Sequence, residues 1–146
     1  LWVDDMQITS DSINILLKNQ KIEKMFFYPN PLIVSEADSL FYNQIMGKYM
    51  TAFFSENKLL KINVKGNGQS LFLIKDDNKD NIGLNKAICT DISINMKESK
   101  LSDITYKIVP ISITTPIQDI IESDKFLKQF IWRMDEKPLS KEDIME

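Results

Sequence analysis

Residues 44–64 read QIMGKYMTAFFSENKLLKINV and align without a gap with two other stretches of the same chain. Residues 7–27 read QITSDSINILLKNQKIEKMFF, and residues 86–106 read KAICTDISINMKESKLSDITY. Self-similarity of this kind is typical of a repeat architecture, in which each copy supplies one supersecondary unit. The sequence therefore predicts three copies of one structural unit.

Apolar and polar side chains alternate within each copy, which is the period of a strand with one buried face. A small residue comes first, a polar cluster ending in lysine interrupts the alternation as a hairpin loop would, and the alternation then resumes. Polar residues at Asn14, Thr51 and Ser93 are expected to face water. The small residues are Ser10, Gly47 and Cys89. The apolar residues expected on the inward face are Ile13, Ile15, Leu17, Met25, Phe27, Met50, Ala52, Phe54, Ile62, Val64, Ile92, Ile94, Met96, Ile104 and Tyr106.

Turn residues follow the returning strand of each copy, at 29–31 (PNP), 66–68 (GNG) and 109–110 (VP). Glycine supplies positive φ and proline withholds a backbone N–H, so the chain must bend or leave its ladder there. A further apolar strand begins after each break. Each unit is thus predicted to be strand, hairpin, strand, corner and strand. An ordinary all-β sandwich whose hairpins resemble one another by chance is the alternative.

The two ends of the chain depart from this pattern. Residues 1–5 resemble the tail of an earlier unit, which predicts that the chain is part of a longer protein. Residues 1–115 are interpreted as the repeats, and residues 116–146 as a terminal cap of the same domain over the end of the core. Within the cap, residues 116–122 are expected to form one or two helical turns, and Ser140 is expected to cap a short acidic helix.

The composition excludes several classes of function. The 146 residues suffice for one domain and carry a net charge of −3, with a single arginine among 18 cationic residues, which disfavours a nucleic-acid binder. Histidine is absent, and this excludes His-based triads and most catalytic zinc sites. The lone Cys89 cannot form an internal disulfide, and no apolar run is long enough to span a membrane.

Candidate chemical motifs in the sequence are weak. Residues 76–81 (DDNKDN) resemble the first half of a calcium loop, but Asn81 replaces its glycine and Ala87 its closing glutamate, so a solvated hairpin loop is predicted. Cys89 has no histidine to activate it and is expected to be a packed small side chain. The carboxylate pairs at 4–5 and at Glu36 with Asp38 are expected to be surface charges. Neither a catalytic residue, nor a metal site, nor a cofactor is predicted.

Apolar sheet faces must pack on each other or on another apolar surface. If the faces close, they form an ordinary core; if they splay, they form a groove that fits an acyl chain. The residues alone favour the closed core, and a groove between the two faces is the alternative.

Four segments resemble the OstA-like proteins of Bacteroidota, which are relatives of LptA and of the periplasmic part of LptD. These segments are YNQIMGKYMTAFF (42–54), VKGNGQS (64–70), GLNKAICTDI (83–92) and FIWRMDEKPLSKEDI (130–144). The resemblance covers residues 39–144 well and the first 38 residues more loosely. It implies an antiparallel β-jellyroll of two sheets in a V, open at both ends, in the periplasm.

What the resemblance implies for function is carriage of lipopolysaccharide between the inner and outer membranes. Jellyrolls of the family join end to end between LptC and LptD, with the acyl chains of lipid A inside the V and the sugars outside. The fifteen apolar residues named above would then contact acyl chains, and Lys48, Lys61 and Lys65 are candidates for contacts to phosphate. A non-catalytic structural or protein-interaction module with a closed core remains the alternative, and no enzyme activity is expected.

Overall fold

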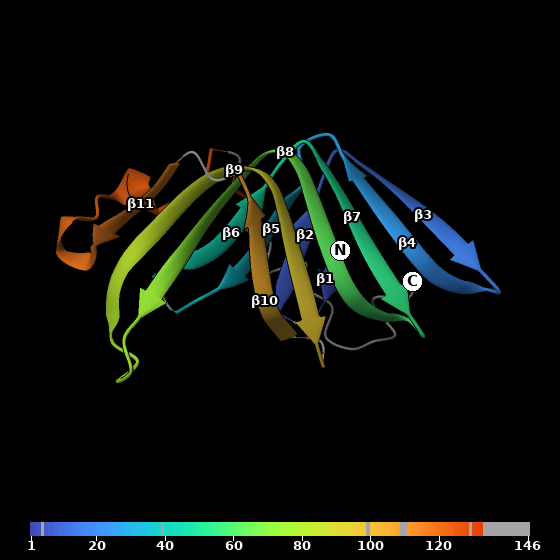
Figure 1. Ribbon diagram of the computed structural model, residues 1–146, viewed down its shortest axis with the longest axis horizontal. Helices are drawn as coiled ribbons and strands as arrows, with labels where there is room; N and C mark the ends of the chain where they lie inside the picture. Colours follow the sequence, from blue (N-terminus) through green and yellow to red (C-terminus); the bar gives the residue numbers. More distant parts are fainter. Residues whose placement is uncertain (4, 39, 99, 109–110, 129, 133–146) are drawn as a thin grey trace.

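The structure is a computed structural model that describes residues 1–3, 5–38, 40–98, 100–108, 111–128 and 130–132. Eleven strands within these residues form one antiparallel sheet, which curls into a half-barrel (Figure 1). The prediction of an all-β fold is confirmed. The strands are β1 (Trp2–Val3), β2 (Met6–Thr9), β3 (Ser12–Lys18), β4 (Lys21–Tyr28), β5 (Leu32–Glu36), β6 (Tyr42–Met46), β7 (Tyr49–Ser55), β8 (Lys58–Lys75), β9 (Asn81–Lys97), β10 (Lys100–Lys107) and β11 (Ile111–Pro116).

Two long neighbouring strands, β8 and β9, pass through both halves of the curled sheet (Figure 1). The first part of β8 pairs with β7 and its last part with β6, while β9 pairs first with β11 and then with β10. One half therefore has the strand order β3-β4-β7-β8-β9-β10, and we call it the β3/β10 half. The other has the order β1-β2-β5-β6-β8-β9-β11, and we call it the β1/β11 half.

Each sequence repeat forms a hairpin that bends across the two halves. The first copy supplies β2 to β5, the second β6 to β8, and the third β9 to β11; in each, the hairpin tip lies in the β3/β10 half and both ends lie in the β1/β11 half. The predicted unit had one corner, whereas the structure has two. The additional bend lies at the small residues Ser10, Gly47 and Cys89, where the first strand of each copy crosses from one half to the other.

The hairpin loops agree with the prediction. Asn19 and Gln20 have φ values of 53° and 66°, and Glu56 and Asn57 have 51° and 61°. Two successive residues with positive φ are the mark of a type I′ turn, whose twist matches that of the strands it joins. The loop between β8 and β9 is held by Asp76, whose Oδ1 accepts hydrogen bonds of 2.9 Å from the backbone N–H groups of Asn78 and Asp80. A hairpin loop at residues 76–81 is thus confirmed.

The second corner of the middle copy is a bulge within continuous β8, in place of the break that the sequence predicted. The register shifts between Lys65 and Gly68, and Gly66 has a φ of 81°. A residue without a Cβ adopts this conformation at little cost. One extra residue in β8 lets the strand turn the corner without losing β9 as its partner.

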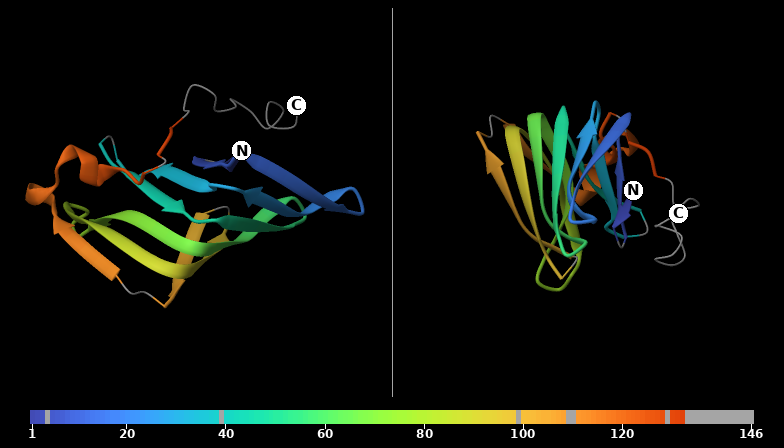
Figure 2. Two further views of the ribbon diagram at one scale, coloured as in Figure 1. Left: turned by 90° about the horizontal axis from the view of Figure 1, so that it is seen from above. Right: turned by 90° about the vertical axis from the view of Figure 1, so that its right-hand side faces the viewer.

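Residues 117–128 and 130–132 lie against the outer side of the β1/β11 half (Figure 2). One short 3-10 turn, Ile117–Asp119, lies within residues 116–122, where one or two helical turns were predicted, and a second, Glu122–Lys125, begins at the end of that stretch. Phe126, Phe130 and Trp132 then surround the Tyr42 ring, with centroid distances of 6.5, 5.0 and 5.2 Å. The helix predicted after Ser140 lies outside the described residues.

Gly47 provides a test of the first bend. A Cβ at this position would lie 2.4 Å from Cγ1 of Val64, which is closer than real Cβ atoms approach. We expect Gly47→Ala to lower the free energy of unfolding by about 1–3 kcal/mol, because packed atoms must shift to admit the methyl group. Urea unfolding measures the loss. Ser10→Ala, at the equivalent position of the first copy, should change it by less than about 0.5 kcal/mol; equal stability of both variants and the parent would show that no close approach is needed.

Candidate functional site

The predicted inward residues form two continuous apolar rows across the β3/β10 half. Directly opposite residues of an antiparallel pair lie on the same face of a sheet, so the strand registers place each row on one face. The first row is Ile13, Phe27, Met50, Val64, Ile92 and Tyr106. The second row is Ile15, Met25, Ala52, Ile62, Ile94 and Ile104. The prediction that these residues share a face is confirmed, and we call it the inner face.

The remaining three predicted residues, Leu17, Phe54 and Met96, lie nearer the hairpin loops. Leu17 pairs with Ile22, and Phe54 pairs with Leu59, beyond a bulge in each hairpin. Phe54 and Met96 pack against the edge of the core. All fifteen predicted residues therefore belong to the β3/β10 half.

The centre of the inner face is closed. Eight of the fifteen residues are at most 4% exposed: Met25, Phe27, Met50, Ala52, Ile62, Val64, Ile92 and Ile94. They form one cluster with Met6, Ile8, Ile33 and Ile45 from the β1/β11 half, which the curl of the sheet brings opposite them (Figure 2). At these positions the structure has the closed core that the residues alone favoured.

Strand β3 carries the part of the inner face that stays uncovered. Ile13, Ile15 and Leu17 are 42%, 55% and 59% exposed, and none of them belongs to the core cluster. We call these three residues the β3 strip. They continue the buried rows to the edge of the sheet, where β3 pairs with β4 on one side and is the last strand of its half. Phe54, Met96, Ile104 and Tyr106 are partly buried, so the inner face is also incompletely covered near its other margins.

A few polar groups border the inner face. The hydroxyl of Tyr106 lies 3.1 Å from that of the buried Ser70, and burial raises the pKa of Tyr106 although this hydrogen bond opposes the shift. Burial also raises the pKa of the Cys89 thiol, with a smaller contribution from the nearby charge of Asp91. A buried thiol with a raised pKa is a poor nucleophile. Cys89 is a packed small side chain, as predicted.

The three lysines predicted to contact phosphate do not share a face with the apolar rows. Lys61 pairs with Phe53 and Lys65 with Tyr49, at positions that alternate with the inner residues Ile62 and Val64. They therefore project from the opposite side, which we call the outer face. Lys48 is exposed in the bend between β6 and β7.

Asp38 has a structural role in a turn. Its Oδ1 accepts hydrogen bonds from the backbone N–H groups of Leu40 and Phe41, and its Oδ2 accepts one from Asn81. Desolvation alone would raise the pKa of Asp38, but these hydrogen bonds outweigh it and the pKa is lowered. Glu36 and Asp5 are exposed, and Asp4 lies outside the described residues.

The outer face of the β3/β10 half has a feature that the sequence pattern did not predict. Aromatic rings project from it at Phe26, Tyr28, Tyr49 and Phe53, among the polar residues that were expected there. The aligned repeats contained a signal for this feature. At the outward position where the third copy has the polar residue Asn95, the first and second copies have the apolar residues Leu16 and Phe53.

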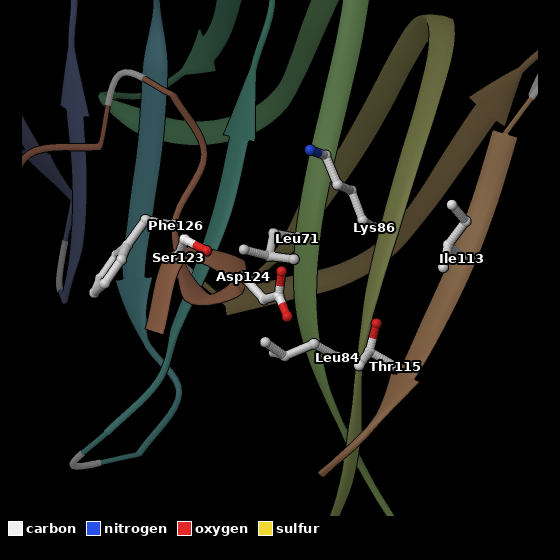
Figure 3. Close-up of a pocket in the computed structure, with 8 residues that line it drawn as sticks. All are labelled: Leu71, Leu84, Lys86, Ile113, Thr115, Ser123, Asp124 and Phe126. Atoms are coloured by element: carbon white, nitrogen blue, oxygen red, sulfur yellow. The ribbon is translucent and has the colours of Figure 1, made fainter. Parts of the chain in front are cut away.

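A separate pocket of about 210 Å³ lies between the outer side of the β1/β11 half and the C-terminal segment (Figure 3). Leu71, Leu84 and Lys86 line it from β8 and β9, and Ser123 and Asp124 from the second 3-10 turn. We assign no function to this pocket.

Among the residues that the structure describes, no group of three or more Cys, Asp or Glu side chains is arranged to hold a metal ion. Neither of the short 3-10 turns could cross a membrane, and no longer helix occurs in that part of the chain. The chain matches no protein-family model, no curated protein and no solved structure.

Proposed function

We propose that this chain is a periplasmic lipopolysaccharide-binding module of a transport bridge between the inner and outer membranes, and that it binds acyl chains on its inner face. The observation that carries the proposal is the pair of continuous apolar rows that emerge from the core as the exposed β3 strip. In this proposal the two halves of the curled sheet are the two sheets of a V-shaped β-jellyroll. The resemblance of residues 39–144 to OstA-like proteins supports it.

The physical basis is transfer of apolar surface out of water. Each acyl CH₂ that leaves water contributes about 0.8 kcal/mol, so an uncovered apolar strip lowers the cost of moving a lipid without altering any bond. An acyl chain would first lie along Ile13, Ile15 and Leu17. Deeper entry would require the two halves to part, and the flexible side chains of Met25 and Met50 suit such repacking. This role requires no catalytic residue, metal or cofactor.

The edges of the β3/β10 half would connect neighbouring modules, either LptC-like and LptD-like proteins or further copies of this chain. Strands β3 and β10 each lack a second partner in this half and run in opposite directions. Addition of β10 to the β3 edge of the next module would therefore continue the antiparallel ladder by backbone pairing. The apolar rows would then continue from Tyr106 and Ile104 to Ile13 and Ile15 of that module.

A second candidate function is a structural or protein-interaction module that binds no lipid. The burial of the eight central residues favours it, because a closed core needs no ligand to be stable. The two functions differ in what contacts the β3 strip.

Photocrosslinking in cells distinguishes them. We expect a photoreactive residue at Ile15 or Leu17 to form adducts with lipopolysaccharide, because both side chains are exposed on the inner face. Leu16 is a matched control, since it is an apolar residue of the same strand, is 46% exposed and faces outward. Adducts are detected with antibody to lipopolysaccharide after electrophoresis.

The outcome at Leu16 decides the interpretation. We expect its adduct yield to be at least about tenfold lower, since every acyl carbon placed on the outer face would stay in water. Equal yields at positions 15, 16 and 17, or no lipopolysaccharide adduct at any of them, would contradict lipid binding. Protein adducts at position 15 without lipid adducts would favour the interaction module.

A further inference from the structure

The outer face of β3, β4, β7 and the first part of β8 combines aromatic rings with positive charge. Lys24 and Lys61 are both paired with Phe53, and Lys65 is paired with Tyr49. The outward paired positions of these four segments are all described and carry no carboxylate, and on the adjacent strand β9 Asp91 lies directly opposite Lys65. In a chain with a net charge of −3, this is a local excess of positive charge.

A shallow pocket of about 280 Å³ lies among the rings of this face. Tyr28 and Tyr49, which are 38% and 61% exposed, line it together with Phe26. Asn14 and Thr51 supply polar groups to the same pocket, and the Asn14 side-chain amide donates a 2.6 Å hydrogen bond to the Tyr28 hydroxyl. The pocket therefore presents apolar ring surface beside donors and acceptors of hydrogen bonds.

We propose that this pocket binds one ring of a phosphorylated saccharide. A pyranose ring has apolar C–H surfaces that pack on aromatic rings, and its hydroxyls can bond the side chains of Asn14 and Thr51. The pocket is smaller than the sites of drug-sized ligands, which fits a single sugar ring. Lys65 lies between the pocket residue Tyr49 on one side and Asp91 on the other, and in this proposal it turns toward the pocket and binds a phosphate on that ring as a point charge.

Other occupants fit this surface less well. A peptide strand cannot add to it by backbone pairing, because β4 and β7 are both paired on two sides. An acyl chain would meet polar side chains at Asn14, Thr51 and Asn63, whose burial without partners is costly. The exposed rings of the site lie on the opposite side of the sheet from the apolar rows, and the buried Phe27 and Met50 of the first row also border the pocket.

The test is isothermal titration of the full chain with the phosphorylated oligosaccharide obtained by removing all acyl chains from lipopolysaccharide. The choice of this probe rests on the proposed function. We expect saturable binding that Tyr49→Ala and Lys65→Gln each weaken about tenfold, through loss of the ring surface and of the charged contact. Lys86→Gln, on the other half, and Thr105→Ala, an exposed outward position on β10 at the far edge of the same half, are the controls and should bind as the parent does. Enzymatic removal of the phosphates should abolish the difference between Lys65→Gln and the parent.

Three results would overturn the proposal. The first is no saturable binding of the oligosaccharide, and the second is equal binding by all four variants. The third is binding to phosphatidylglycerol vesicles with the same dependence on Tyr49 and Lys65 but no binding to the oligosaccharide, which would make the face a membrane surface. Because a saccharide bound to this face would also lie near Leu16, the Leu16 crosslinking control is measured in the Tyr49→Ala variant. Since the probe has no acyl chains, none of these results changes the adducts expected at Ile15, so the two proposals can fail separately.

Discussion

Phe27→Ala is expected to lower the free energy of unfolding by about 3–5 kcal/mol, which is the usual cost of removing a fully buried aromatic side chain. Phe27 is 0% exposed and lies in the first apolar row, between Ile13 and Met50. Truncation removes its transfer free energy and leaves a cavity between the two halves. Chemical unfolding of the lipid-free protein, monitored by circular dichroism, measures the loss.

Ile13→Ala is the matched control, because Ile13 pairs directly with Phe27 on the same face but is 42% exposed. Its truncation should cost less than about 1 kcal/mol, since much of the side chain already contacts water. A small loss for Phe27→Ala, close to that of Ile13→Ala, would show that the centre of the inner face is loosely filled without ligand. That result would favour an open groove over the closed core.

The contrast between Phe27 and Ile13 also shows what the sequence could predict and what it could not. The alignment of the repeats placed both residues on one face, because directly opposite residues of antiparallel strands lie on the same side of the sheet. Exposure depends in addition on whether another part of the chain lies above that face. Phe27 packs in one cluster with residues of the β1/β11 half, namely Met6, Ile8, Ile33 and Ile45. The periodicity of apolar residues within the repeats does not indicate how far these residues lie from β3.

The sequence predicted the second bend of each repeat but not the first. Pro29 and Gly66 indicate a corner, because proline lacks a backbone N–H and glycine readily adopts a positive φ. At Ser10 and Cys89 neither proline nor glycine marks the bend, although the inward residues change from Ile8 to Ile13 and from Cys89 to Ile92, an odd number of positions apart. The small size of these residues was a signal for the bend. Gly47 shows the reason, because a Cβ at this position would lie 2.4 Å from Cγ1 of Val64.

The position of the C-terminal segment could not be derived from its own apolar residues. Phe126 and Trp132 predicted that the segment is buried, but many apolar surfaces could have received it. Its place depends on hydrogen bonds to Gln44, a polar residue of β6 that the repeat pattern did not single out. Gln44 is 0% exposed because the segment covers it.

The side-chain amide of Gln44 both donates and accepts hydrogen bonds with the backbone of the C-terminal segment, as a neighbouring strand would. Its Oε1 accepts a 2.7 Å hydrogen bond from the N–H of Leu127, and its Nε2 donates one of 2.7 Å to the carbonyl of Lys125. Gln7 repeats the arrangement on β2, where its Nε2 donates to the carbonyl of Ile131 at 2.7 Å. The segment is thereby held to the sheet at two places along residues 125–131.

Gln44→Leu is therefore expected to cost about 2–4 kcal/mol, although the new side chain has nearly the same shape and is more apolar. The N–H of Leu127 and the carbonyl of Lys125 would lose their partner in a buried place, and each unsatisfied group costs about 1–3 kcal/mol. If the segment detaches to regain water, Trp132 leaves its edge contact with Trp2, and tryptophan fluorescence shifts to the red before global unfolding. Gln69→Leu, on the same face and partly exposed, should change stability by less than about 0.5 kcal/mol. Unchanged stability and emission in Gln44→Leu would show that aromatic packing around Tyr42 holds the segment without these hydrogen bonds.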